Sequence, residues 1–302
     1  MSWLIFAFSG PILWAASTHI DKYLVEKYFK HGSVAVLMVF TAIIGLFALP
    51  FIYFFQPSVL CIPLQEMVET AVSGILYMGA IYVYLQALQS EEASVVAPFF
   101  QLAAIFGFIL GYLFLGEVPL PAQLAGGLLI IAGSTLLSLK FTGKKTKLKR
   151  RLILLMLACT LALAFSSLIF KFFSLQNEYW TTSFWNFVGQ ALFGVVLMAT
   201  AANRKRFYQT IRTNTGAVLA INGANELINL GGGLGVRYAL LLAPLGIVQA
   251  ISSTTLFFVL LFGILLSVFF PKLGREEITA ASLIQKGIAT ILVVIGVILV
   301  NQ

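Results

Sequence analysis

Long apolar stretches separated by short polar breaks run along the whole chain. Each stretch has about 20 residues, the length that an α-helix needs to cross the hydrocarbon core of a membrane. The stretches lack the alternation of apolar and polar residues that membrane β-strands show, and a helix is the other structure that satisfies its own backbone within a bilayer. The pattern predicts ten transmembrane helices, at residues 3–22, 33–55, 67–88, 93–115, 120–139, 152–172, 180–201, 215–237, 244–270 and 281–300.

The composition agrees with this prediction. Of the 302 residues, 60% are hydrophobic and only 10% are charged, whereas an ordinary soluble domain has about 25% charged residues. So few charges cannot cover the surface of a soluble protein, which excludes a cytosolic enzyme, a nucleic-acid-binding protein and a disordered chain. The expected fold class is an all-α polytopic membrane protein. The two cysteines fall in a loop and inside a helix, so no disulfide framework is expected.

The basic residues indicate an orientation. Seventeen of the 19 Lys and Arg residues follow the first, fifth, seventh and ninth predicted helices. Since basic loops stay in the cytoplasm, we expect a bacterial inner-membrane protein with both termini outside. The basic run 144–151 is interpreted as a solvated connector near anionic lipid headgroups rather than a nucleic-acid patch. Lys171 and Arg237 fall at the other ends of their helices, where long side chains usually extend to the membrane surface.

The chain divides into two halves of five predicted helices. Residues 1–139 form the first half, a basic cytoplasmic linker covers 140–151, and residues 152–302 form the second half. Residues 17–23 align with residues 166–172 in their Ser, Ile, Lys and aromatic positions. Because five is odd, two such repeats cross the membrane in opposite senses. Inverted repeats are typical of secondary transporters, whose substrate site lies where the repeats meet.

Glycine and alanine recur at matching places in the two halves. The last helix of each half has two small residues spaced by seven, Gly126 and Gly133 in the first and Ala289 and Gly296 in the second.

Several motifs of the first half resemble those of the EamA-type drug/metabolite transporter family. They are Ala93-Ser94-Val95-Val96-Ala97-Pro98-Phe99-Phe100-Gln101, then Leu113-Phe114-Leu115-Gly116-Glu117, then the helix from Gly126 to Gly133. The resemblance implies a transporter, often an exporter, that moves amino acids, metabolites or drugs. It also implies a central cavity lined by helices 1, 3, 4, 6, 8 and 9. Members of that family commonly carry their basic residues in the other set of loops, and the second half here has no clear Leu-Gly-Glu.

Glu226 is the one charged residue expected at mid-membrane depth. Asn222, Asn225 and Asn229 share its helix face, since Asn225, Glu226 and Asn229 lie three, four and seven residues after Asn222. A carboxyl group in hydrocarbon is costly and usually faces a cavity where it takes part in function. Burial favours its neutral form, which suits proton exchange. A structural hydrogen-bond network between helices remains the alternative.

Other polar and aromatic residues are expected near the same site. The full set of substrate-binding candidates is Glu226, Asn222, Asn225, Asn229, Tyr77, Trp14, Ser17, Gln101 and Gln249. The proton-coupling candidates are Glu226, His19 and Asp21, although His19 and Asp21 also suit a purely interfacial role. Asn186 and Gln190 suit hydrogen bonding between helices. Four glycines at 231–233 and 235 either open their helix at the site or allow close helix packing.

The sequence contains no nucleophile–base arrangement and no metal- or phosphate-binding motif. We therefore expect no enzymatic activity, no cofactor and no metal site. The expected function is secondary active transport, in the export direction, of small polar or amphipathic metabolites such as amino acids or drugs. It would proceed by alternating access, with proton coupling as an option. The alternative is a flippase for lipids or lipid-linked sugars on the same scaffold. The expected partners are a small-molecule substrate and membrane lipids, without nucleic acid, for a monomer or homodimer.

Overall fold

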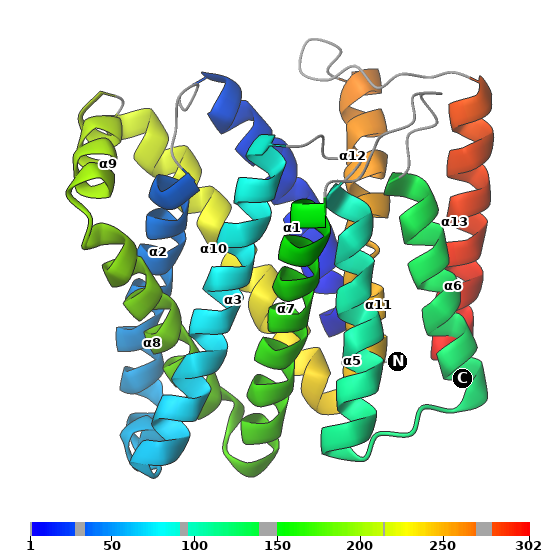
Figure 1. Cartoon of the computed structure of the whole chain (residues 1–302), viewed down its shortest axis with the longest axis horizontal. Helices are drawn as coiled ribbons and strands as arrows, with labels where there is room; N and C mark the ends of the chain where they lie inside the picture. Colours follow the sequence, from blue (N-terminus) through cyan, green and yellow to red (C-terminus); the bar gives the residue numbers. More distant parts are fainter. Residues whose placement is uncertain (1, 28–33, 91–95, 139–149, 214, 270–279) are drawn as a thin grey trace.

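In the computed structural model, the chain is a bundle of long helices joined by short connections (Figure 1). The structure describes residues 2–27, 34–90, 96–138, 150–213, 215–269 and 280–302. Within these residues there is no β-strand, and the all-α fold class is confirmed.

Each predicted apolar stretch corresponds to a helix or to a pair of helices. The helices of the first half are α1 (Ser2–Lys27), α2 (Val34–Phe55), α3 (Leu64–Ser90), α5 (Gln101–Leu115) and α6 (Pro121–Ser138), with short 3-10 helices η1 (Pro57–Leu60) and η2 (Ala97–Phe100). The helices of the second half are α7 (Arg150–Gln176), α8 (Tyr179–Met198), α9 (Ala201–Thr213), α10 (Thr215–Leu242), α11 (Leu245–Ser252), α12 (Thr255–Phe269) and α13 (Ala280–Val300).

Several of these helices have the length and apolarity of a membrane span. Among the described residues, five segments qualify, namely Trp3–Asp21, Val34–Phe55, Leu64–Ala87, Arg150–Gln176 and Leu245–Leu266. The pair α8 and α9 qualifies only as one span bent by 101°. Shorter apolar helices cover Gln101–Leu115, Pro121–Leu137 and Ile284–Val300. The chain is a multi-pass membrane protein.

Two details differ from the pattern expected from the sequence. The basic residues after α8 form a separate amphipathic helix, α9, in which Phe207 is buried and Arg204, Lys205 and Arg206 are exposed. The predicted helix at 244–270 is divided into α11 and α12 near Ser253, where backbone hydrogen bonds take the tighter i to i−3 form.

Small residues explain the closest helix pairs. The α6–α13 interface has Gly126 against Gly296, and a Cβ atom on Gly126 would lie 2.6 Å from the carbonyl oxygen of Gly296. Gly133 faces Ala289 in the same way, at 2.8 Å from its carbonyl oxygen. The small residues spaced by seven in each half therefore pack against each other, which lets the backbones approach.

Two of the glycines of α10, Gly232 and Gly235, serve the same purpose against α1. A Cβ atom on Gly232 would lie 3.3 Å from the Cα atom of Gly10 and 3.1 Å from Nε1 of Trp14. Helix α10 continues without interruption through residues 231–235. The structure thus favours close packing over an opened helix at Gly232 and Gly235, while a Cβ atom on Gly233 would meet nothing within 4 Å.

Candidate functional site

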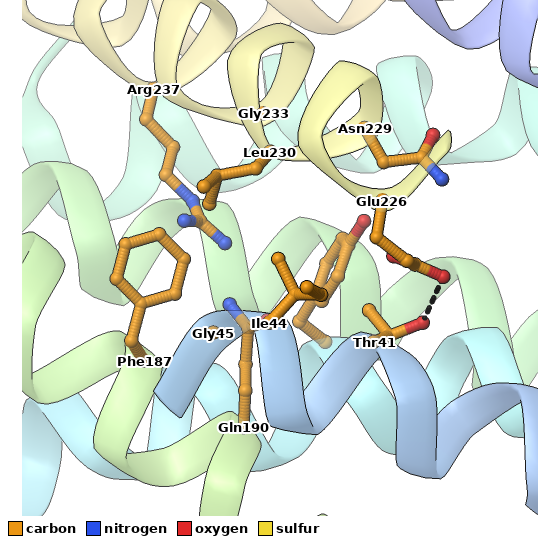
Figure 2. A pocket seen from close by; sticks show the side chains of 11 residues that line it. Thr41, Ile44, Gly45, Phe187, Gln190, Glu226, Asn229, Leu230, Gly233 and Arg237 are labelled. Carbon is orange, nitrogen blue, oxygen red and sulfur yellow. Dashed lines mark hydrogen bonds between the residues drawn. The ribbon is translucent and has the colours of Figure 1, made fainter. Parts of the chain in front are cut away.

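Helices α2, α3, α8 and α10 enclose a narrow pocket that combines apolar, polar and charged side chains (Figure 2). Its lining residues are Thr41, Ile44, Gly45, Tyr77, Phe187, Gln190, Glu226, Asn229, Leu230, Gly233 and Arg237. The cavity volume is about 40 Å³, which suffices for a few water molecules. Pockets for drug-sized ligands are larger, at about 300–1,000 Å³.

Glu226 faces this pocket from α10. Its side chain is 7% exposed, and its Oε1 atom accepts a hydrogen bond of 2.9 Å from the hydroxyl group of Thr41 on α2 (Figure 2). Asn229, about one turn further along α10, lines the same pocket. The structure therefore brings together Glu226, Asn229 and Tyr77 among the predicted candidates, and adds Thr41, which the sequence did not reveal.

Arg237 lines the pocket from the same helix. Its guanidinium carbon lies 5.1 Å from the ring centre of Phe187, 5.5 Å from that of Phe170 and 5.7 Å from that of Tyr77. The prediction that this side chain extends to the membrane surface is wrong. Three aromatic rings from α3, α7 and α8 hold the cation inside the bundle, because a ring face attracts positive charge.

The remaining asparagines on the face of Glu226 lie outside the pocket lining. Asn225 donates a hydrogen bond of 2.6 Å from Nδ2 to Oδ1 of Asp21, which joins α10 to α1. Asn225 is completely buried and its Oδ1 atom has no hydrogen-bond partner among the described residues. Asn222 is 2% exposed. Asp21 was predicted, with His19, to take part in proton coupling beside Glu226. It is thus hydrogen-bonded to Asn225, the residue just before Glu226.

Other predicted site residues make contacts elsewhere. Nε2 of His19 lies 3.0 Å from the carbonyl oxygen of Val259 on α12. Gln249 on α11 donates a hydrogen bond of 2.7 Å from Nε2 to Oγ of Ser167 on α7. Gln101 is 3% exposed and its Oε1 atom has no partner among the described residues.

The two candidates on α1 belong to helix packing. Trp14 packs against Gly232 of α10, and Ser17 is 2% exposed. Neither residue is part of the pocket lining, nor are His19, Gln101 and Gln249.

The expected hydrogen bonding between helices is confirmed for Asn186, whereas the hydrogen bond of Gln190 lies within α8. Asn186 on α8 donates a bond of 2.6 Å to Oγ of Ser73 on α3, and Gln190 donates one of 2.8 Å to Oδ1 of Asn186. Ser166 on α7 donates to the carbonyl oxygen of Ser73 at 2.8 Å. These bonds hold three helices together behind the pocket, and Gln190 also contributes to its lining.

A second charged site lies apart from the pocket. Lys171 on α7 forms an ion pair with Glu117, which follows α5. Lys171 also donates a hydrogen bond of 2.6 Å to the carbonyl oxygen of Ala243, and the backbone amide of Leu245 donates one of 2.7 Å to Glu117. With 6% of its side chain exposed, Lys171 does not reach the membrane surface, and that prediction is wrong.

The glycine of the Leu115-Gly116-Glu117 motif explains how Glu117 reaches Lys171. Gly116 ends α5 with φ 65°, a left-handed conformation that glycine adopts without steric cost. The chain therefore reverses sharply and turns the next side chain back toward the bundle.

Apolar helices that cross a membrane several times and enclose a charged pocket define the class of multi-pass membrane proteins with an internal polar site. Residues 1–139 match the model of the EamA-like transporter family. The match confirms the resemblance seen in the sequence and indicates a membrane transporter of the drug/metabolite type, a family of transporters rather than of enzymes.

A solved structure described as "Crystal structure of protein" has the same fold. It has a TM-score of 0.67 and 14% sequence identity, and the alignment covers 99% of this chain and 97% of that chain. None of the curated proteins compared with the chain matches it.

Proposed function

We propose that the chain is a secondary active transporter that exports small polar or amphipathic solutes by alternating access. The observation that carries this proposal is the pocket, in which Glu226 and Asn229 of the second half meet Thr41 and Tyr77 of the first half. A carboxyl group within a membrane protein typically marks a substrate or ion pathway. Glu226 would bind a cationic group of the solute or carry the coupling proton.

The helix contacts support two inverted repeats. If α1 corresponds to α7 and α3 to α10, the pair α1–α10 corresponds to the pair α7–α3, and both pairs are in extensive contact. The pairs α2–α8 and α6–α13 join corresponding helices of the two halves. This arrangement fits a two-fold relation about an axis in the membrane plane, which alternating access uses.

The charge distribution supports an orientation. Helix α9, with its basic residues, lies at the same end of the bundle as the beginning of α13, and η1 with the α5–α6 connection lies at the opposite end (Figure 1). We place the end with α9 in the cytoplasm. In a bacterial inner membrane both termini would then be outside.

The proposal is tested with the full-length protein in liposomes that contain a pH-sensitive dye. A panel of amino acids, amines and organic acids is first screened for thermal stabilisation of the protein, since a ligand of the folded state raises its melting temperature. Solutes that stabilise are added outside, and the proton flux is recorded. We expect a solute-dependent flux that Glu226→Gln reduces roughly tenfold or more, at unchanged melting temperature.

Glu178→Gln is the matched control, because Glu178 is exposed at the beginning of α8. It should retain the flux of the unchanged protein. Full gradient-driven transport by Glu226→Gln would exclude the proposed role of Glu226. Movement of labelled lipid between leaflets, without flux of any solute in the panel, would favour the flippase.

A further inference from the structure

Arg237 presents unused hydrogen-bond donors to the pocket. Among the described residues, no carboxylate lies within 4 Å of its guanidinium group and no hydrogen bond to it is formed, while Lys171 pairs with Glu117 elsewhere. A guanidinium group has five N–H donors in one plane. An arginine within a membrane is costly and normally has a partner, and the described residues do not supply one.

The aromatic rings leave a defined part of Arg237 open. Phe187, Phe170 and Tyr77 lie 5.1–5.7 Å from the guanidinium carbon and attract the cation through their faces. Rings cannot replace the oxygen atoms that the in-plane N–H groups require. Figure 2 shows the guanidinium group of Arg237 directed from α10 toward the pocket interior.

We propose that Arg237 forms a subsite for the carboxylate group of the transported solute. This proposal rests on the proposed transport function and assigns a substrate class to the same pocket. The planar fork of arginine donates two parallel hydrogen bonds to a carboxylate. A carboxylate is favoured over a phosphate because it is flat, carries a single negative charge, and suits a narrow pocket bounded by rings.

The position of Glu226 limits which solutes fit. Glu226 and Arg237 are eleven residues apart on the uninterrupted helix α10, which corresponds to a rise of about 16 Å. Figure 2 shows the two side chains at opposite sides of the pocket. An α-amino acid carries its ammonium and carboxylate groups on one carbon atom and cannot contact both residues in this conformation. Binding at Arg237 therefore requires a carboxylate and does not require a neighbouring amine.

The test compares carboxylates with their neutral amides. Butyrate, hexanoate and benzoate are titrated into the purified full-length protein, each beside its amide and the corresponding phosphonate, and binding is measured by calorimetry. We expect each carboxylate that binds to exceed its amide, and Arg237→Gln to weaken it by about 30-fold or more. That is the loss typical of truncating one partner of a buried charged hydrogen bond. Arg237→Lys should restore part of the binding, since it keeps the charge without the fork.

Two controls separate this proposal from the other possibilities. Arg204→Gln changes an exposed arginine on α9, and Glu178→Gln changes an exposed carboxylate at the beginning of α8. Both variants lie outside the pocket lining and should leave carboxylate binding unchanged. If carboxylates bind in a way that depends on Arg237 but no proton flux is observed, the transport proposal is contradicted and the carboxylate subsite is not. Four results would each overturn the subsite. They are equal binding of acid and amide, tighter binding of the phosphonates, no binding of any carboxylate, and unchanged binding by a folded Arg237→Gln protein.

Discussion

The ammonium group of Lys171 contacts the carboxylate of Glu117 in a buried ion pair that joins α7 to the connection after α5. The same two side chains bind the backbone on both sides of Pro244, through the carbonyl oxygen of Ala243 and the amide of Leu245. The pair therefore fixes the junction between α10 and α11 as well as the end of α5.

Removing the lysine alone should destabilise the protein strongly. Lys171→Met leaves the carboxylate of Glu117 buried without its counter-ion, and breaking a buried pair in this way typically costs about 3–5 kcal/mol. The melting temperature in detergent should fall clearly below that of the unchanged protein.

The double variant is the informative control for the ion pair. Glu117→Gln combined with Lys171→Met removes both charges, so it should be more stable than Lys171→Met alone. If the single variant were as stable as the unchanged protein, the ion pair would have no structural role.

Gly189 should not tolerate a methyl group. A Cβ atom there would overlap the carbonyl oxygen of Ala71 at the α3–α8 contact. We expect Gly189→Ala to lower the free energy of unfolding by about 1–3 kcal/mol, the usual range for overpacking. Gly223→Ala should have the opposite sign, because a Cβ atom at Gly223 meets nothing within 4 Å and alanine stabilises a helix by about 0.5–1 kcal/mol relative to glycine. Equal effects of the two changes on chemical unfolding would refute this packing.

Asn186 should contribute to stability through its neighbours. Asn186→Ala leaves Nε2 of Gln190 and Oγ of Ser73 each without a bond that Asn186 now makes. Loss of a buried partner typically costs about 1–3 kcal/mol, which thermal unfolding would detect. Gln65→Ala, at an exposed hydrogen bond to Glu69, should stay within about 0.5 kcal/mol. A similar melting temperature for both variants would count against the network.

The orientation can be read from a native cysteine. Cys61 is exposed between η1 and α3, whereas Cys159 is buried. A membrane-impermeant maleimide should label intact cells through Cys61, and Cys61→Ser should abolish the signal. Tyr208→Cys on α9, in the Cys61→Ser background, should be labelled only after permeabilisation. The reverse pattern would place the end with α9 outside.

The sequence was sufficient for the helices and for part of the pocket. Apolar length predicted the segments, and the helical spacing of Glu226 and Asn229 placed both on the face that lines the pocket. The same spacing could not separate them from Asn225, which bonds to α1 instead. Helical periodicity shows which residues share a face, but which other helix each of those residues contacts depends on tertiary packing.

Arg237 and Lys171 show why the rest could not be predicted. A basic residue near the end of an apolar stretch usually extends to the membrane surface, and nothing local distinguishes the exceptions. Their surroundings come from distant segments, with rings from α3, α7 and α8 for Arg237 and the α5–α6 connection for Lys171. Thr41 could not be predicted as a site residue either, since a single hydroxyl group in an apolar helix gives no sequence signal of a pocket.

Helix α9 has a consequence for the depth of α8 in the bilayer. Its exposed basic residues favour anionic headgroups by about 1 kcal/mol each, while Phe207 packs against Phe40 of α2. Helix α9 is bent by 101° from α8. With α9 on the membrane surface, any movement of α8 along the membrane normal would pull these charges away from the headgroups. Phe187 and Gln190 belong to α8. The lipid composition of the leaflet next to α9 should thus influence the height at which these two side chains enter the pocket.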